Sequence, residues 1–282
     1  MTRLLFRLII GAAFALFGLV SYFGSASENP VTGETQRVKL TPEEEIALGR
    51  QARDELMAQA GGLYPDEVLQ GYIDQIGAEV VQESVASQSP YPFEFHLLQD
   101  SETVNAFALP GGQIFITTGL LDRLTNEAQL AGVLGHEIAH VVARHGAEHL
   151  AKQQLGAFLV NAIVLGTSDA PQDSRQAAIL AQAIQQMVNL RYGRQDELES
   201  DRLGIDFMTE AGYNPQGLVE LMRVLKEASG GAAPPEFFST HPHPDSRIDK
   251  IEDIIAQRYP NGVPDPLEEG ETDFQRTVDP RL

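Results

Sequence analysis

The chain has 282 residues, which is enough for one large domain or two small ones with a substantial core. Its formal net charge of −20 argues against a nucleic-acid partner, which would need a basic surface. The sequence contains no cysteine. Disulfides, thiolate metal sites and a cysteine nucleophile are therefore excluded, and any transition metal must be held by histidine and carboxylate side chains.

The N-terminal segment has the layout of an export signal. Two arginines precede an uninterrupted apolar run over residues 8–20, and the small residues Gly24 and Ala26 follow it. Residues 1–27 fit a signal peptide, and residues 4–23 counted together fit a membrane anchor. Because positive charges precede the run and an acidic residue follows it, both alternatives place the rest of the chain outside the cytoplasm. We expect an exported protein, either periplasmic or held at the membrane by this segment if it is not cleaved.

The next segments predict a linker and two helices. Turn-forming residues over 28–40 indicate the linker. A capping box with proline at the first helical position predicts a helix over residues 41–60. A proline followed by aspartate predicts the second helix over residues 65–83.

Alternating apolar and polar residues then predict a small sheet. Residues 93–97 alternate as a half-buried strand does, with His96 on the polar side as an ordinary strand histidine. Residues 103–109 and 113–117 predict two further strands, which Pro110-Gly111-Gly112 joins into a hairpin.

The first strand of this hairpin is also a candidate substrate site. An exposed edge strand can hold an extended peptide by adding it to the sheet. We therefore predict that Asn105, Ala106 and Phe107 bind substrate. The alternative is that the Pro-Gly-Gly segment is only a turn.

Residues 126–152 predict one long helix that carries the most informative motif of the chain. Asn126 can cap its first turn, and apolar residues recur at three- and four-residue steps. His136 and His140 are four residues apart, so they lie on one face of this helix, one turn apart. Two imidazoles at this spacing can bind one Zn²⁺, and Glu137 beside them can act on a water at the ion. The alternative is a buried helix that carries these residues by chance.

A second motif, His145-x-x-Glu148-His149, follows on the same predicted helix. On a continuous helix, His145 lies nine residues beyond His136 and half a turn away from its face. The two motifs therefore cannot serve one metal ion. Charged neighbours indicate a solvated helix end, and we expect His145 and His149 to be mostly surface residues.

Two further stretches have a helical character. Residues 155–165 are apolar apart from one asparagine, but they are too few to span a bilayer. We expect a buried helix there, with a lid over the site or a shallow membrane contact as alternatives. Residues 177–190 again show helical periodicity.

A zinc site needs a third protein ligand, and an acidic motif can supply it. Glu197 and Asp201 are four residues apart, hence on one helical face, whereas Glu199 points away. Glu197 can be the ligand, and Asp201 can accept the free N–H of a ligating histidine and fix its tautomer. The alternative is a solvated acidic face, which is common in so acidic a chain. The upstream His-Glu-x-x-His motif favours the metal site.

Four motifs in this order resemble metallopeptidase family forty-eight, which includes the HtpX-like, CAAX prenyl and periplasmic BepA-like zinc proteases of the gluzincin type. The similarity covers about residues 40–258. The single N-terminal apolar segment is more similar to the periplasmic members than to HtpX, which has several spans. Ser200 departs from the alanine that the family often has. The four motifs lie at residues 105–112, 135–140, 197–204 and 239–248.

The resemblance implies one zinc ion per chain, bound by His136, His140 and Glu197, with Glu137 as the general base. The BepA-like members also place a histidine equivalent to His241 near the metal. There, it would occupy the open zinc position in a latent state or donate to the tetrahedral oxyanion.

Arg247, in the same C-terminal motif, has two interpretations. It holds a carboxylate or orients the loop that carries His241, or it simply caps a helix. The neighbouring His243 is expected to be structural.

Together these observations predict an α+β protein that is mostly α-helical, with a zincin-like metalloprotease domain and a small β-sheet beside the active-site helix. We expect this domain to span residues 41–258 and an acidic, mobile tail to span 259–282. The expected function is zinc-dependent hydrolysis of peptide bonds in misfolded or misassembled cell-envelope proteins. The alternatives are a chaperone-like binding protein of the envelope with little or latent proteolysis, and a protein in which zinc is only structural.

Overall fold

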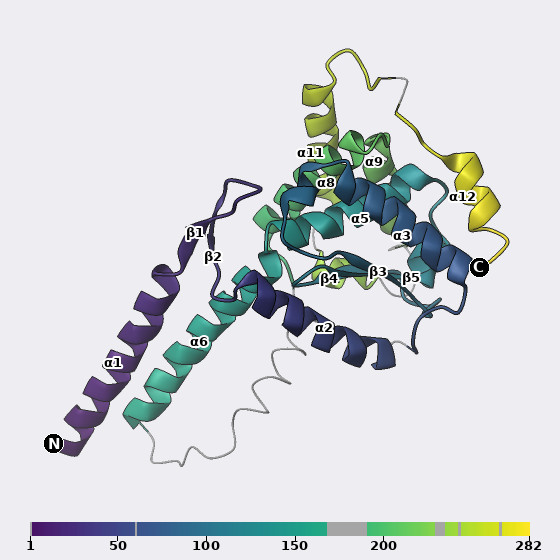
Figure 1. Cartoon of the computed structure of the whole chain (residues 1–282). Helices are drawn as coiled ribbons and strands as arrows, with labels where there is room; N and C mark the ends of the chain where they lie inside the picture. Colours follow the sequence, from purple (N-terminus) through teal and green to yellow (C-terminus); the bar gives the residue numbers. More distant parts are fainter. Residues whose placement is uncertain (1, 60, 168–190, 229–234, 242–243, 265–266) are drawn as a thin grey trace.

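The computed structural model describes residues 2–59, 61–167, 191–228, 235–241, 244–264 and 267–282. Helices dominate these residues and small sheets lie among them, which confirms an α+β fold that is mostly α-helical (Figure 1). The helix expected over residues 177–190 lies outside the described residues. The elements in chain order are α1 (Thr2–Phe23), β1 (Ala26–Glu28), β2 (Thr35–Arg37), α2 (Pro42–Gln59), α3 (Glu67–Gln82), the 3-10 helix η1 (Val85–Gln88), β3 (Glu94–Leu98), β4 (Ala106–Leu109), β5 (Gln113–Thr117), α4 (Thr118–Leu121), α5 (Glu127–Val142), α6 (His145–Thr167), α8 (Arg194–Glu210), α9 (Gln216–Ala228), α10 (Phe237–Thr240), α11 (Pro244–Arg258) and α12 (Glu271–Thr277).

The two helices expected before the sheet are α2 and α3, and local capping sets where they begin. At α2, the Thr41 backbone N–H donates to the Glu44 carboxylate at 2.8 Å, and the Glu44 N–H donates back to the Thr41 hydroxyl at 3.3 Å. At α3, the Asp66 carboxylate accepts two backbone N–H groups of the first turn. Both starts were predictable because the partners are neighbours in the chain.

The sheet beside these helices has three strands in the order β3-β5-β4. β3 runs parallel to β5, and β4 runs antiparallel to it with Phe107 opposite Phe115. The predicted hairpin at residues 110–112 is therefore present, and Gly111 adopts a φ of 85°, which favours glycine. β4 begins only at Ala106, three residues later than the predicted strand.

The side chains of β5 face two different layers, because successive residues of a strand point to opposite faces. Ile114 and Ile116 belong to the main core with α3 and α5, whereas Phe115 packs with Ala52 and Leu56 of α2. The sheet therefore lies between α2 on one face and α3 with α5 on the other (Figure 1).

α5 is the central helix of the domain, and all its residues from Ala128 to Val142 are buried. Asn126 caps it as expected, since its side chain accepts the Gln129 backbone N–H at 2.8 Å. Small residues let other helices approach; Gly132, for example, lies against the Leu218 backbone of α9. Helices α3, α8 and α9 all pack against α5, and α11 covers α8 and α9 (Figure 1).

The single helix expected over residues 126–152 is in fact two helices. α5 ends at Val142, and Arg144 adopts a φ of 60° before α6 begins. A residue other than glycine in this left-handed region costs free energy, so tertiary contacts must stabilise it. The Arg144 guanidinium donates to the buried Glu45 carboxylate at 2.9 Å and to the Leu40 carbonyl at 2.6 Å. These partners lie about a hundred residues away, so no local pattern predicts the break.

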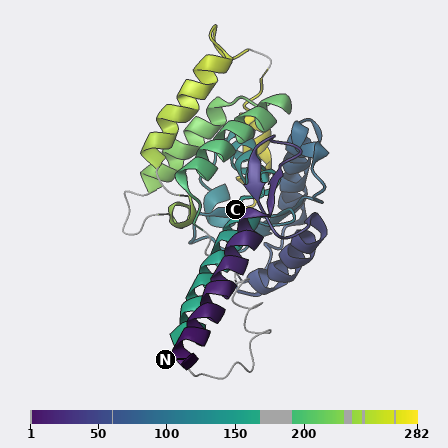
Figure 2. The ribbon, with the colours of Figure 1, turned by 90° about the vertical axis from the view of Figure 1, so that its left-hand side faces the viewer.

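α6 leaves the body of the domain beside α1 (Figures 1 and 2). The apolar stretch at residues 155–165 was expected to be a buried helix, and this prediction is wrong for its described side chains. Ala157 is exposed, Leu159 is 37% exposed, and Phe158 is half-buried against α1. β1, at the end of the predicted signal segment, pairs antiparallel with β2, which lies within the expected linker of residues 28–40, and the two strands connect α1 to α2.

The C-terminal tail is packed where the structure describes it. Phe274 of α12 and Val278 are buried in the main core, and the Tyr64 hydroxyl donates to the Arg281 carbonyl at 2.6 Å. The prediction of a mobile tail over 259–282 is therefore wrong for these residues. Composition alone does not reveal that two apolar side chains of the tail reach the core.

Candidate metal centre

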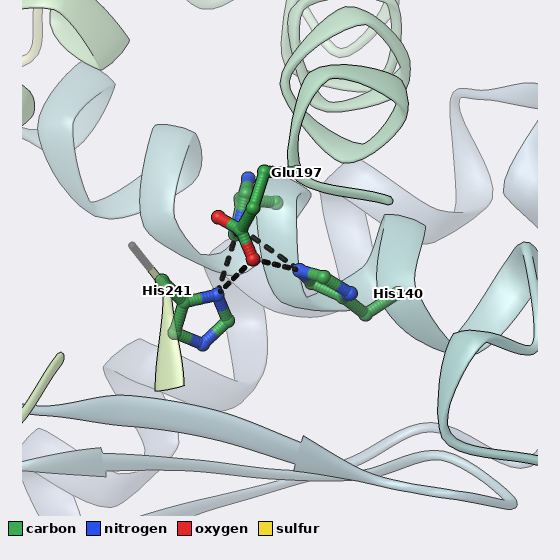
Figure 3. A group of neighbouring side chains, drawn as sticks. His140, Glu197 and His241 are labelled. Carbon is green, nitrogen blue, oxygen red and sulfur yellow. Dashed lines mark hydrogen bonds and ion pairs between the residues drawn. The ribbon is translucent and has the colours of Figure 1, made fainter. Parts of the chain in front are cut away.

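Four buried side chains from three parts of the chain meet at one place (Figure 3). His136 and His140 come from α5, Glu197 from the first turn of α8, and His241 directly follows α10. One ligand atom of each lies within 4.8 Å of the others, and each residue is at most 2% exposed. A set of imidazole nitrogens with one carboxylate oxygen is a donor set that zinc takes in hydrolytic sites.

Two glycines let the helices that carry these donors approach closely. A Cβ on Gly135 of α5 would lie 3.2 Å from the Gly204 carbonyl oxygen of α8. A Cβ on Gly204 would lie 3.0 Å from the His136 backbone nitrogen. A side chain at either position would force the facing backbone to shift, so the close packing of the two helices helps to set the distance between His136 and Glu197.

The two histidines and the acidic residue predicted from their spacing come together in the structure. The Nε2 atoms of His136 and His140 are 3.1 Å apart. Glu197 Oε1 lies 3.6 Å from His140 Nε2, and its Oε2 lies 3.7 Å from His136 Nε2. Glu199 lies outside this group, with its carboxylate 3.4 Å from His145.

Asp201 and Arg247 form a layer behind the donors. Asp201 Oδ1 lies 3.1 Å from His136 Nδ1, so it accepts the Nδ1–H and leaves Nε2 facing the centre. The Arg247 guanidinium donates to both Asp201 oxygens, at 2.6 and 2.8 Å, and to Glu197 Oε2 at 2.5 Å. Arg247 lies within α11 and binds two carboxylates through these contacts.

Charge compensation keeps these buried carboxylates ionised. Burial opposes the charge of Asp201, but Arg247 and His136 outweigh it and lower the pKa of Asp201 to about 2. Burial also opposes the charge of Glu197, and His241 and Arg247 together hold its pKa below the ordinary range. Both acids therefore present anionic oxygens at neutral pH, as metal ligation and histidine orientation require.

His241 is fixed so that its ring faces the same space. Its backbone N–H donates to the Phe237 carbonyl at 2.7 Å, and its ring stacks on Phe237 with centroids 4.4 Å apart. Its Nδ1 lies 3.0 Å from Glu197 Oε1 and 3.4 Å from His136 Nε2 (Figure 3). The structure thus brings the predicted His241 among the donor atoms.

Glu137 contributes buried carboxylate oxygens whose hydrogen-bonding capacity is not used. Among the described residues, neither oxygen has a hydrogen-bond partner, and neither does Nε2 of His241, which lies 3.6 Å from Glu137 Oε1. Buried polar groups are normally satisfied, so these orphaned atoms fit a site completed by an ion and a water. Burial raises the pKa of Glu137, which suits a group that has to accept a proton.

Two residues near the centre were not predicted from the sequence. His145, expected at the surface, is buried, and its Nδ1 lies 3.0 Å from Nδ1 of His140. Tyr192 stacks on the His140 ring with centroids 3.9 Å apart. His145 was placed at the surface because the helix break at Arg144 was not predicted. Tyr192 precedes α8, so no helical periodicity in the sequence indicates which way its side chain points. His149 is only partly buried, and neither it nor His145 belongs to the group of four.

The predicted substrate residues lie on the hairpin. Ala106 and Phe107 begin β4, which is an edge strand of the three-stranded sheet, and Asn105 directly precedes it. Residues 108–110 at the other end of β4 line a small pocket together with His140. The hairpin therefore runs past the metal-binding face of α5.

Comparison with known proteins agrees with this geometry. The model of the peptidase family M48 matches residues 67–255. The chain is 33% identical over 250 residues to the beta-barrel assembly-enhancing protease of Escherichia coli (strain K12), covering 85% of this chain and 50% of that protein. It is 30% identical over 259 residues to the mitochondrial metalloendopeptidase OMA1 of Schizosaccharomyces pombe, covering 89% and 73%. The human mitochondrial metalloendopeptidase OMA1 is 29% identical over 271 residues, covering 89% and 50%.

The chain spans about half the length of the bacterial relatives that it matches. Within that span, the matched segment contains α5, α8, His241 and the part of α11 that carries Arg247, which supply all the residues of the centre described above. The sequence motifs, the four-residue donor group and the family match agree with one another, and the chain belongs to the peptidase family M48.

Proposed function

We propose that this protein is a zinc-dependent endopeptidase that hydrolyses peptide bonds of misfolded or misassembled cell-envelope proteins. The observation that carries the proposal is the donor group of His136, His140, Glu197 and His241. The buried carboxylate of Glu137, which has no hydrogen bond to a described residue, lies beside it. Family membership supports the reaction class. The name of the bacterial relatives, beta-barrel assembly-enhancing protease, supports a substrate in the envelope.

The proposed roles follow from which atoms face the centre. His136, His140 and Glu197 hold the ion, and Asp201 fixes the tautomer of His136. When bound, zinc supplies Lewis-acid activation of a water and of the scissile carbonyl. Glu137 takes the proton from the attacking water and delivers it to the leaving amine, because its buried carboxylate has no hydrogen bond to a described residue and lies next to the donors.

Arg247 keeps the acidic ligand in place. Its guanidinium donates to both Glu197 and Asp201, which lie one turn apart on α8. Arg247 therefore positions the proposed metal ligand Glu197 and also Asp201, which accepts the Nδ1–H of His136. Without it, two buried anionic groups would repel each other.

With zinc held by His136, His140 and Glu197, His241 would be a fourth ligand in the place that water or substrate needs. Its Nδ1 lies among the donor atoms, and its stacking on Phe237 orients the ring toward them. A zinc ion with four protein ligands has no open position, so this arrangement is a latent one. Activation then requires that His241 move away from the centre.

A His241→Ala variant is expected to keep its zinc and to hydrolyse casein several-fold faster than the unchanged protein. The remaining three ligands are those of a catalytic zinc site. His149→Ala is the matched control, since His149 pairs with Asp196 outside the donor group, and it should leave the rate unchanged. A fall of about 10²-fold in His241→Ala would instead assign His241 to oxyanion stabilisation.

Asn105, Ala106 and Phe107 are proposed to bind the substrate as an added strand. They lie at the start of the edge strand β4, whose other end borders the pocket next to His140. An extended peptide paired with this edge would run past the donor group with its backbone held by hydrogen bonds.

α1 is proposed to place the protein at a membrane with its main domain outside the cytoplasm. Residues 5–23 of this helix are long and apolar enough to cross a membrane, as judged by length and composition. The arginines before the apolar run support this orientation.

The enzymatic proposal is tested by measuring zinc content and casein hydrolysis on the full chain in detergent. We expect one zinc per chain and hydrolysis that a chelator abolishes and added Zn²⁺ restores. Absence of zinc would contradict the proposed centre. One zinc without cleavage, in both the unchanged protein and His241→Ala, would favour a structural metal.

A further inference from the structure

α1 and α6 form an antiparallel two-helix arm, which consists of residues 2–23 and 151–167. Both views show the helices side by side and extending from the body of the domain (Figures 1 and 2). Phe158 of α6 lies between them, with ring centroids 5.1 Å from Phe14 and 6.0 Å from Phe17. Gly18 faces the same ring closely, since a Cβ there would lie 2.8 Å from Phe158 Cβ.

The outer surface of this arm is apolar. On α6, Leu159 is 37% exposed, and α1 exposes several more large apolar side chains. Leaving so many large apolar side chains in water is unfavourable, and a patch of this kind marks an interaction site. Seven large apolar side chains in the described part of α1 are more than half exposed, namely Leu5, Phe6, Ile9, Leu16, Phe17, Val20 and Phe23.

The two helices change from apolar to polar at about the same level. α6 is polar at residues 152–154 and apolar over residues 155–165 apart from Asn161. Because Phe158 lies opposite residues 14–18 of an antiparallel helix, residue 154 lies level with about residue 20 of α1. The apolar run of α1 ends at that level, at Val20. The arm therefore has one boundary between an apolar end and a polar base.

Cationic and aromatic side chains gather at the end of the arm nearest the domain body. The Arg37 guanidinium lies 6.0 Å from the Tyr22 ring and 5.6 Å from the Phe23 ring. The Lys39 ammonium lies 5.4 Å from the Phe158 ring. In a chain with a net charge of −20, this local positive charge next to an apolar end matches the interface of a bilayer with anionic headgroups.

We propose that α6 enters the lipid bilayer together with α1, so that two helices anchor the catalytic domain to the membrane. The apolar part of α6, residues 155–165, is about 16 Å long, or roughly half of a hydrocarbon core. It therefore inserts against α1 to a limited depth, with Arg37 and Lys39 at the headgroups. This rests on the membrane position proposed for α1, but not on the zinc chemistry.

The absence of cysteine in the natural sequence allows a direct test of depth. Single-cysteine variants of the full chain, each carrying an environment-sensitive fluorophore, are placed in phosphatidylcholine–phosphatidylglycerol vesicles. Leu159→Cys reports on α6, Leu16→Cys on α1, and Asp54→Cys on the exposed surface of α2. Quenching by nitroxide-labelled lipid and by aqueous iodide is then compared, with zinc content as the check that each variant is folded.

We expect lipid quenching and protection from iodide at both residue 159 and residue 16, and the reverse at residue 54. Iodide quenching at 159 with lipid quenching at 16 would overturn the proposal, because α1 alone would then be embedded. Protection from both quenchers at 159 would also overturn it, because a second protein surface would then cover α6. Iodide quenching at both positions would refute the membrane position of α1 as well, while leaving casein hydrolysis unaffected.

Discussion

A Glu137→Gln variant is expected to keep its zinc while its kcat/KM for casein or a peptide falls by about 10²–10⁴-fold. Glutamine has nearly the same shape as glutamate but cannot accept the proton of the attacking water. The site should stay assembled, because neither Glu137 oxygen makes a hydrogen bond to a described residue. Zinc content by atomic absorption and initial rates of hydrolysis check both halves of this expectation.

The control is Glu148→Gln in the second His-x-x-Glu-His motif. Glu148 accepts the Arg37 backbone N–H and pairs with Lys152, away from the donor group. Its variant should retain at least half of the activity. Equal losses in both variants would mean that Glu137 has no specific role. A Glu137→Gln protein that does not cleave but fully replaces the natural protein in cells would favour the chaperone-like alternative.

An Arg247→Ala variant should lose about 3–5 kcal/mol of folding stability, because it leaves Glu197 and Asp201 as uncompensated buried charges. Metal affinity should also fall by about 10–100-fold, since the partners of the ligands lose their positions. Thermal unfolding followed by circular dichroism measures the first effect, and zinc titration measures the second.

Arg223→Ala is the matched control for this prediction. Arg223 pairs with Glu252 at the surface, with both side chains about half exposed, so its removal should change stability by less than about 1 kcal/mol. Adding Asp201→Asn to Arg247→Ala should recover part of the lost stability, because one of the two unpaired charges is removed. If Arg247→Ala unfolds at the same temperature as the control, the buried ion pairs of Arg247 with Glu197 and Asp201 do not stabilise the fold.

The sequence predicts the parts of the fold whose causes are local. The capping box of Thr41 and Glu44, the Pro-Gly-Gly hairpin and the alternation of β3 all depend on residues close in the chain. The spacing of His136 and His140 predicts their common face for the same reason. The proximity of Glu197, on α8, to these two histidines has no local cause. It was predicted only because the acidic motif and the His-Glu-x-x-His motif occur in the same chain.

The errors concern features that depend on distant contacts. The break between α5 and α6 is stabilised by contacts of Arg144 with Glu45 and Leu40, which are distant in the chain. The periodicity of residues 126–152 alone therefore predicted one continuous helix, with His145 at the surface. The described tail is ordered by Phe274 in the core, which composition does not indicate. Stacking of Tyr192 on His140 likewise joins segments about fifty residues apart.

The contact of Gly135 with Gly204 has a consequence for how the protein acquires and loses its metal. The donors on α5 and α8 are held near one another by backbone packing in the core, so the protein itself preorganises the site. Binding then does not bear the conformational entropy cost of bringing two helices together. Small zinc domains behave differently, because the ion assembles them and they unfold without it. We therefore expect this protein to remain folded when the metal is removed and to bind it again.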